Sequence, residues 1–261
     1  MDAEKHIYAA TGMIKSPDDD RDYPLAKLIV KAELPPASYR NEIKAPVYNQ
    51  RDVGCCVACS LATCKYLIEM AQLGEARPFS VKYIYGNRDE STNHEEGMIP
   101  REALKVLKKF GDCHWDLFSG YAEYPVSNDE YIKNKARYDT DAYPYRISSY
   151  YRLKTKLDIM TAVSTLGVVT IACPAHESLF FPDENNFVKY DAKEEIYGYH
   201  EMTLIGYDNV KKYWIIQNSW GKEYGEDGIV YISMDYPIVE AWAIVDEIME
   251  HELTKCSNEE G

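Results

Sequence analysis

A run of nineteen residues headed by two adjacent cysteines, CCVACSLATCKYLIEMAQL at 55–73, constrains the fold more than any other part of the chain. Its apolar residues recur at helical spacing, and Gly74 stands where a helix of this length would stop. The sequence therefore predicts a long helix whose amino terminus carries a cluster of cysteines.

Helical patterns fill the rest of the first half of the chain, and strand patterns dominate the second half. A helix is predicted over 99–110, with Pro100 in its first turn and Gly111 just past its end, and further helices over 127–137 and 154–165. Short segments rich in β-branched and aromatic residues follow: LGVVTIAC, EMTLIGYDN, KYWIIQNSW and GIVYIS. This order predicts an α+β protein of two lobes, helical then antiparallel β, with a ligand site in the cleft between them.

The chain divides into four parts on the same patterns. The turn-rich, charged segment KSPDDDRDYP marks a loop within an amino-terminal extension. The predicted parts are this extension (1–33), a mainly helical lobe (34–150), a mainly β lobe (151–250) and a flexible tail (251–261).

Charge and cysteine usage exclude several classes of partner and environment. A formal net charge of −14 and a pI near 4.9 argue against nucleic acid, because binding to phosphates needs clustered lysines and arginines. No segment is apolar enough to be a signal peptide or a membrane span, so no membrane partner is predicted. Seven cysteines, four of them within ten residues, do not form a secreted disulfide framework. A reducing, cytoplasmic compartment is favoured, or the excised mature part of a secreted or virion protein.

Three kinds of chemistry are open to the cysteine cluster. Cys56 and Cys59 have the spacing of a zinc-ligand pair, but a structural zinc site needs a second pair or two histidines at suitable spacing. A redox pair of the thioredoxin kind also begins a helix, but it follows a buried strand, whereas PVYNQRDVG precedes these cysteines. The third is a single nucleophilic thiolate, which needs a distant histidine, a group that orients this histidine, and an oxyanion donor.

A block in the second half of the chain, QNSWGKEYGEDG at 217–228, favours the nucleophilic thiolate. Together with Gln50, six residues before Cys56, and with GYH at 198–200, this block resembles the papain-like cysteine peptidases, the cathepsin family. The histidine of GYH lies 144 residues after Cys56, which fits that arrangement. The resemblance covers approximately residues 34–248.

The resemblance implies a role for each of these residues. By the family's pattern, Cys56 is the nucleophile, His200 its proton partner, Asn218 the residue that orients the imidazole, and Gln50 the side-chain donor of the oxyanion hole. A helix amino terminus and an imidazolium both favour a thiolate, so Cys56 and His200 would form an ion pair. Substrate-binding roles are implied for Gly97, which pairs with the substrate backbone, Met98 and Ile99, which face an apolar second subsite, Tyr199, beside the histidine, and Trp220, which covers the Asn218–His200 bond.

The sequence departs from the family's pattern around the nucleophile. Gly-Cys-Cys-Val at 54–57 stands where the family has Gly-Ser-Cys-Trp, so an extra thiol lies beside the nucleophile. Counting from Gln50 favours Cys56 over Cys55, since a slip of one residue turns a side chain by about 100° around a helix. Val53 replaces a disulfide cysteine of the family, which implies a bacterial or viral branch that lacks the usual disulfides. Tyr199 replaces the common aspartate or asparagine, which should alter the pH dependence.

The resemblance implies a cysteine endopeptidase that hydrolyses protein or peptide substrates through a thioester acyl-enzyme. It implies a monomer that needs no metal and no cofactor. Two alternatives stay open: a catalytically blocked papain-fold binding module, and an acyl-transfer (transpeptidase) enzyme. Residues 1–33 are shorter than the family's inhibitory propeptide. They either cross the cleft as a short plug, which would make the chain a zymogen, or pad one lobe, and padding is slightly favoured.

Overall fold

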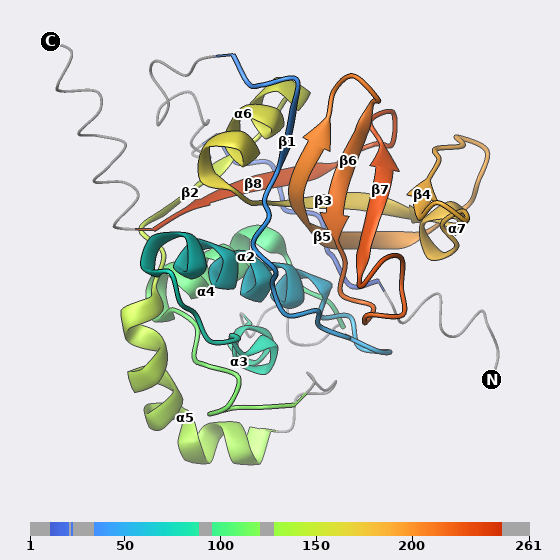
Figure 1. The fold of residues 1–261 in the computed structure, drawn as a ribbon. Helices are drawn as coiled ribbons and strands as arrows, with labels where there is room; N and C mark the ends of the chain where they lie inside the picture. The colour runs from blue at the N-terminus through green and yellow to red at the C-terminus, as the bar shows by residue number, and fades with distance from the viewer. Residues whose placement is uncertain (1–10, 21, 23–33, 89–95, 121–127, 247–261) are drawn as a thin grey trace, which may run out of the picture.

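The long helix predicted from the cysteine-headed run is present and lies at the centre of the molecule (Figure 1). The structure is a computed structural model that describes residues 11–20, 22, 34–88, 96–120 and 128–246. Helix α2 (Cys56–Leu73) ends at Gly74, whose φ of 73° is readily adopted only by glycine. Thirteen of its 18 residues are buried, so α2 is covered on nearly all sides and serves as a core element.

Three further helices of the first half follow, in the lower left of Figure 1. They are α3 (Val81–Gly86), α4 (Pro100–Phe110) and α5 (Asn128–Ala142), and the 3₁₀ turn η2 (Tyr143–Tyr145) follows. Helices α3 and α4 pack beside α2, and α5 lies farther from it. Helix α4 confirms the prediction, since it begins at Pro100 and is capped by Gly111. Helix α5 runs past the predicted end at 137, because Tyr138 and Ala142 bury their side chains against Phe118 in a small separate core.

The second half forms most of a single sheet. Its strands in spatial order are β2 (Ser149–Arg152), β8 (Glu240–Val245), β3 (Val169–His176), β5 (Ile196–Asp208), β6 (Tyr213–Gln217), β7 (Ile229–Ser233) and β4 (Phe187–Val188), and β1 (Ser38–Arg40) also pairs with β5. The pairs are antiparallel except β4 with β7, which is parallel. The sheet is therefore mixed only at this short edge, and the α+β prediction is confirmed.

The sequence patterns missed some helices and strands, and they predicted the ends of others to within two residues of the observed ends. Helix α6 (Lys156–Leu166) is the helix predicted over 154–165, but the short helix α7 (Glu177–Phe180) was not predicted. Strand β8 was not predicted either: all six of its residues are buried, so it lacks the alternation that marks a half-exposed strand. The predicted boundary at 150 falls inside β2, and the four-part division stays a prediction. The predicted tail at 251–261 lies outside the described residues.

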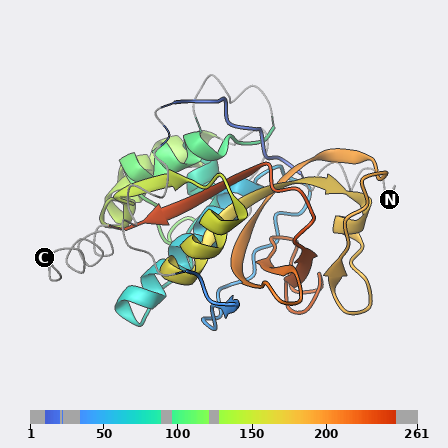
Figure 2. The same ribbon diagram turned by 90° about the horizontal axis from the view of Figure 1, so that it is seen from above.

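Helix α2 lies on one face of the sheet and α6 on the other (Figures 1 and 2). Alternate residues of β3 divide between the two sides: Ala172 joins the core around α2, and Ile171 joins the core around α6. A buried hydroxyl contact, Ser60 Oγ to Thr170 Oγ1 at 2.7 Å, ties α2 to the sheet. No helix in the described part of the chain has the length and apolarity needed to cross a membrane. This packing brings the cysteine-bearing start of α2 against the middle of β5.

Candidate active site

The amino terminus of α2 presents two buried thiols in different directions. Cys55 is the N-cap residue, and its Sγ lies 3.9 Å from Cys59 Sγ, one turn along the helix. Cys56, the first helical residue, instead lies against the backbone of Glu201 in β5. The first turn of α2 contains no acidic residue, so the positive end of the helix dipole acts on Cys56 without compensation from a carboxylate. Cys56 therefore has the position expected of the nucleophile, and Cys55 does not.

His200 lies directly before Glu201 in β5, and Asn218 lies directly after β6. His200 Nε2 and Asn218 Oδ1 are 2.7 Å apart, and both side chains are buried. Because the amide oxygen only accepts, this bond places a proton on Nε2 and leaves Nδ1 as the nitrogen that can exchange a proton with a thiol. Asn218 Oδ1 also accepts from the backbone N–H of Ser219 at 2.8 Å, which fixes the amide.

Trp220 covers the histidine. Its ring stacks on the His200 ring with centroids 4.5 Å apart and an interplanar angle of 27°. The indole keeps water from one face of the imidazole, which strengthens the hydrogen bond to Asn218.

Gln50 reaches the same place from the other lobe, because the segment before α2 pairs with the segment after β6. Asn49 forms an antiparallel bridge with Trp220, and Gln50 N–H donates to Ser219 O at 2.8 Å. Ser219 Oγ donates to Gln50 Oε1 at 2.7 Å, which turns the nitrogen of the side-chain amide toward the turn before α2, where it donates to Val53 O. The four predicted catalytic residues thus come together from α2, β5 and the two segments that join the lobes.

The chain matches a family model described as "Papain family cysteine protease" over residues 37–246. This chain belongs to the papain family of cysteine proteases. Procathepsin L of Rattus norvegicus is 25% identical over 213 residues, which cover 73% of this chain and 57% of that protein, and mouse procathepsin L is 29% identical over the same coverage. The chain thus spans little more than half the length of these curated relatives.

Solved structures of papain-family proteases share the fold. Xylellain, a cysteine protease from Xylella fastidiosa, superposes with a TM-score of 0.76 at 22% identity, covering 92% of this chain and 97% of the other. ProCathepsin B S9 from Trypanosoma congolense superposes with a TM-score of 0.70 at 15% identity, covering 94% of this chain and 89% of the other. These likenesses show that the two-lobe papain fold is present.

The predicted substrate-binding residues divide between the two sides of this papain-type cleft. Tyr199 and Trp220 lie beside His200, and Gly97, Met98 and Ile99 lie before α4 in the helical lobe. Gly97 has a φ of 120°, and its backbone is used inside its own lobe, since its N–H donates to Tyr85 Oη and its C=O accepts from Arg88. Its neighbour Met98 instead offers its N–H and C=O to the cleft. Ile99 is the N-cap residue of α4, directly after Met98.

The cleft is occupied by the chain's own amino-terminal extension. Gly12 and Met13 donate to Tyr199 O at 3.3 and 3.1 Å, and Met98 N–H donates to Gly12 O at 2.8 Å. Gly12 lies so close to Gly54, just before the nucleophile, that a Cβ on Gly12 would be 2.1 Å from Gly54 O. Padding of one lobe was the favoured prediction for this extension, but residues 11–14 bond to both sides of the cleft.

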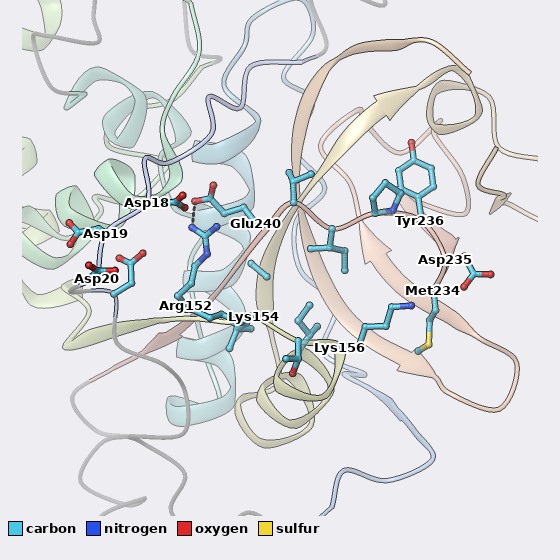
Figure 3. A pocket seen from close by; sticks show the side chains of 18 residues that line it. Asp18, Asp19, Asp20, Arg152, Lys154, Lys156, Met234, Asp235, Tyr236 and Glu240 are labelled. Carbon is cyan, nitrogen blue, oxygen red and sulfur yellow. Dashed lines mark ion pairs between the residues drawn. The ribbon is translucent and has the colours of Figure 1, made fainter. Parts of the chain in front are cut away.

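Two anchors hold the extension beyond the cleft. Ser16 N–H donates to Glu240 Oε2 at 3.0 Å, and Glu240 Oε1 pairs with Arg152 at 3.0 Å, as Figure 3 shows beside Asp18. Asp22 forms a two-bonded ion pair with Arg101, at 2.8 and 2.5 Å. We call residues 11–20 and 22 the strap. The sequence singled out the charged segment within it as a loop and gave no sign of these partners.

Burial raises the pKa of two side chains at this site, Cys56 and Glu201. It raises the pKa of the Cys56 thiol far above its usual value, by more than hydrogen bonding with the Glu201 backbone lowers it. Burial also raises the pKa of Glu201 to about 8. Burial of Cys56 therefore opposes the ion pair with His200 that the resemblance implies. Sequence analysis did not single out Glu201, although a carboxylate at the start of the apolar segment EMTLIG was a visible signal.

The remaining observations on the site concern its cysteines and possible metal ligands. Six cysteines, at 55, 56, 59, 64, 113 and 173, are buried thiols. Within the described residues, no group of three or more His, Cys, Asp or Glu side chains is placed to hold a metal ion.

Proposed function

We propose that this chain is a cysteine endopeptidase that acts through a thioester at Cys56. The observation that carries the proposal is the 2.7 Å bond between His200 and Asn218 beside the start of α2. Proteins and peptides are the substrates, because the papain family consists of proteases. Both sides of the cleft belong to one chain, which supports a monomeric enzyme.

The proposed first half of the reaction forms the acyl-enzyme. His200 Nδ1 takes the proton of the Cys56 thiol, and the resulting thiolate attacks the peptide carbonyl. A C–S bond forms, the carbonyl π bond opens, and the carbonyl oxygen takes the negative charge. This oxyanion accepts hydrogen bonds from the Cys56 backbone N–H and from Gln50 Nε2. An amide nitrogen carries two N–H bonds, so Gln50 can hold Val53 O and donate to the oxyanion at once. The C–N bond then breaks while the His200 imidazolium protonates the departing amine.

The second half releases the product. His200, now neutral, takes a proton from water, which attacks the thioester carbonyl. The second tetrahedral intermediate breaks its C–S bond, which frees the acid product and restores the thiolate. Asn218 keeps the imidazole in one orientation through both halves, so the same Nδ1 atom gives and takes the proton.

We further propose that the strap keeps the enzyme latent, as a short propeptide would. Its backbone uses the hydrogen-bonding groups of Met98 and Tyr199 that an extended substrate would need. Met13 is 5% exposed and belongs to the same core cluster as Met98 and Trp242. This supports the apolar second subsite, since an apolar substrate side chain would take the place of Met13.

The strap also favours a second candidate, the catalytically blocked binding module. One substitution separates the two candidates in the full chain. Any side chain at residue 12 collides with Gly54 O, so Gly12→Leu should expel the strap without touching the catalytic residues. The measurements are cleavage of a peptide library and the site of labelling by a cysteine-directed epoxide, mapped by mass spectrometry.

We expect Gly12→Leu to cleave peptides at least tenfold faster than the unchanged chain and to carry the label on Cys56. Cys56→Ala in the Gly12→Leu chain should abolish both signals, and Cys55→Ala should not. A folded Gly12→Leu chain that neither cleaves nor labels at Cys56 would support the binding module. Equal rates of peptide cleavage with and without Gly12→Leu would refute the proposed latency, but they would not refute the peptidase function.

A further inference from the structure

Two thiols at the start of α2 have no part in the proposed reaction. Cys55 is the N-cap residue, and its side chain makes no capping hydrogen bond to the helix. Its Sγ instead lies 3.9 Å from Cys59 Sγ, one turn along the helix. Because peptide hydrolysis needs a single thiolate, at Cys56, this pair of thiols is available for other chemistry.

A small movement of the first turn of α2 would join the two thiols. A disulfide needs its Cβ atoms about 3.5–4.5 Å apart, whereas residues four apart on a helix have Cβ atoms about 5–6 Å apart. Closing the bond therefore draws Cys55 and Cys59 together by about 1–2 Å. It distorts the turn in which Cys59 N–H donates to Cys55 O at 3.0 Å. A disulfide formed under such strain is easily reduced again, as a regulatory disulfide must be.

The turn that would move carries both proposed oxyanion donors. Cys55 N–H donates to Val53 O at 2.7 Å, and Gln50 Nε2 donates to the same oxygen at 3.0 Å. The second donor is the backbone N–H of Cys56, directly after Cys55. A displacement of Cys55 therefore shifts the acceptor that holds the Gln50 amide and shifts the Cys56 N–H as well. It does so without any reaction at Cys56 Sγ.

Cys59 is connected to the same donors from the other side. Its thiol lies beside the Ser219 side chain, whose hydroxyl donates to Gln50 Oε1 at 2.7 Å. Drawing this sulfur toward Cys55 changes the packing against the Ser219 hydroxyl. Closure of the bond therefore disturbs the side-chain donor as well as the backbone donor.

The pair is covered while the strap lies in the cleft. Cys55 is 0% exposed and Cys59 1%, and burial raises the pKa of the Cys59 thiol. Gly12 of the strap packs directly on Gly54, the residue before Cys55. Because the thiolate is the reacting form of cysteine, buried thiols of this kind react slowly. We therefore expect the strap to protect the pair, and its displacement to open the turn to small oxidants.

We propose that Cys55 and Cys59 form a reversible disulfide that disables the oxyanion hole once the strap has left the cleft. The oxidant is a small disulfide such as oxidised glutathione. The Cys55 thiolate attacks one sulfur of the oxidant, the S–S bond of the oxidant breaks, and one thiol leaves. Cys59 then attacks the Cys55 sulfur, the Cys55–Cys59 bond forms, and the second thiol leaves. The two protons of the protein thiols pass to the two released thiols, so one small disulfide is reduced for each protein disulfide formed.

The effect on catalysis rests on the proposed peptidase function, but formation of the bond does not. The bond is therefore tested in the full chain carrying Gly12→Leu and Cys56→Ala, in which the strap is displaced and the nucleophile cannot react. The protein is equilibrated with mixtures of reduced and oxidised glutathione, quenched with acid, labelled with N-ethylmaleimide while unfolded, and mapped by mass spectrometry. We expect residues 55 and 59 to lose the label together, to be joined by a disulfide, and to regain the label in excess reduced glutathione.

The same chain with Gly12 restored should oxidise about tenfold more slowly, because its thiols stay buried. Equal rates of oxidation in the two chains would contradict protection by the strap. Labelling of all thiols at every ratio of reduced to oxidised glutathione would overturn the proposal. A disulfide from Cys55 to a cysteine other than Cys59 would overturn it too.

Cys64→Ser is the matched control, because Cys64 is also a buried thiol of α2. It should leave the oxidation of residues 55 and 59 unchanged, whereas Cys59→Ser should leave only a mixed disulfide with glutathione on Cys55. Circular dichroism and thermal unfolding verify that each variant is folded. If Cys59→Ser does not fold, Cys55→Ser tests the same bond from its other end.

A kinetic arm uses the Gly12→Leu chain with Cys56 present. Because glutathione also adds to Cys56, this chain is compared with the same chain carrying Cys59→Ser. The chain with Cys59 should lose half of its peptide-cleaving rate at a several-fold lower ratio of oxidised to reduced glutathione. Equal ratios would show that the bond does not disable the enzyme. If neither chain cleaves peptides under reducing conditions, the peptidase proposal fails, and the labelling experiment still decides whether the bond forms.

Discussion

At the scale of single residues, the cleft depends on hydrogen bonds that hold small polar groups still. Gln50 and Asn218 are both fixed through Ser219, whose hydroxyl donates to one and whose backbone N–H donates to the other. A donor that is already oriented loses no free energy to reorganisation when charge develops on the substrate. We therefore expect Ser219 to position two side chains: Gln50, the proposed oxyanion donor, and Asn218, which orients the His200 imidazole.

Gln50→Ala should lower kcat by about 10²- to 10³-fold, because one oxyanion donor is lost. Ser219→Ala is the control, since it removes the hydrogen bond to Gln50 Oε1 but keeps the donor. Its kcat should fall far less. Kinetics in the Gly12→Leu chain measure both, and an unchanged kcat in Gln50→Ala would show that Gln50 donates no hydrogen bond to the oxyanion.

Glu201 makes the stability of the fold depend on pH. Its pKa is raised to about 8, chiefly by burial, from an ordinary value of 4.5. The folded protein therefore keeps this proton between about pH 4.5 and 8 while the unfolded chain loses it, so this contribution to stability is full below pH 4.5 and is lost as pH rises through 8. Glu201→Gln should reduce the decline between pH 5 and 8 by a few kcal/mol, measured by urea denaturation.

The exposed Glu184 supplies the comparison for that measurement. Glu184→Gln removes a carboxylate from an exposed position, so the pH dependence of the unfolding free energy seen in the parent should remain. If Glu201→Gln and the parent lose stability equally between pH 5 and 8, Glu201 is ionised in the native protein.

At the scale of elements, the strap is held by two anchors outside the cleft as well as by its contacts within it. Asp22 and Arg101 form a nearly buried pair, with side chains 11% and 6% exposed, at the start of α4. Removing one partner of such a pair leaves the other charge without compensation. Asp22→Asn should therefore loosen the strap and raise the peptidase rate of the full chain several-fold. Asp20→Asn, at an exposed position of the same segment, should not, and rates on one quenched peptide compare them.

Elements with local signals were predictable from sequence, and elements defined by distant partners were not. Pro100 and Gly111 bound α4, and Gly74 ends α2, because each of these residues acts on its own backbone. The four residues predicted to be catalytic could be picked out because their spacing is a family pattern, and the structure places them near one another. The strap had no such signal: what places it is a hydrogen bond between Ser16 and Glu240, 224 residues apart. Strand β8 was hidden for the related reason that burial on both faces removes its alternation.

At the scale of the whole molecule, the two lobes share structure that crosses the cleft. Strand β1 comes from the first half of the chain and pairs with β5, and α2 packs on the sheet of the second half. One core cluster contains residues of both, including Leu61 of α2 and Trp242 of β8. The lobes should therefore unfold in one transition, unlike domains joined by a thin linker.

A buried ion pair between the lobes gives the sharpest test of this coupling. Lys65 of α2 is 1% exposed and bonds to Glu69, one turn further along α2, and to Asp246, directly after β8. Lys65→Met should lower the unfolding free energy by about 3–5 kcal/mol, because two carboxylates lose their buried cation. Triple replacement with Lys65→Met, Glu69→Gln and Asp246→Asn should recover part of the loss, since residues 69 and 246 then carry no charge that needs a cation. Urea unfolding followed by both tryptophan fluorescence and circular dichroism should give coincident curves for all three proteins. Two separate transitions in any of them would mean that the lobes fold independently and that the cleft is a boundary between domains.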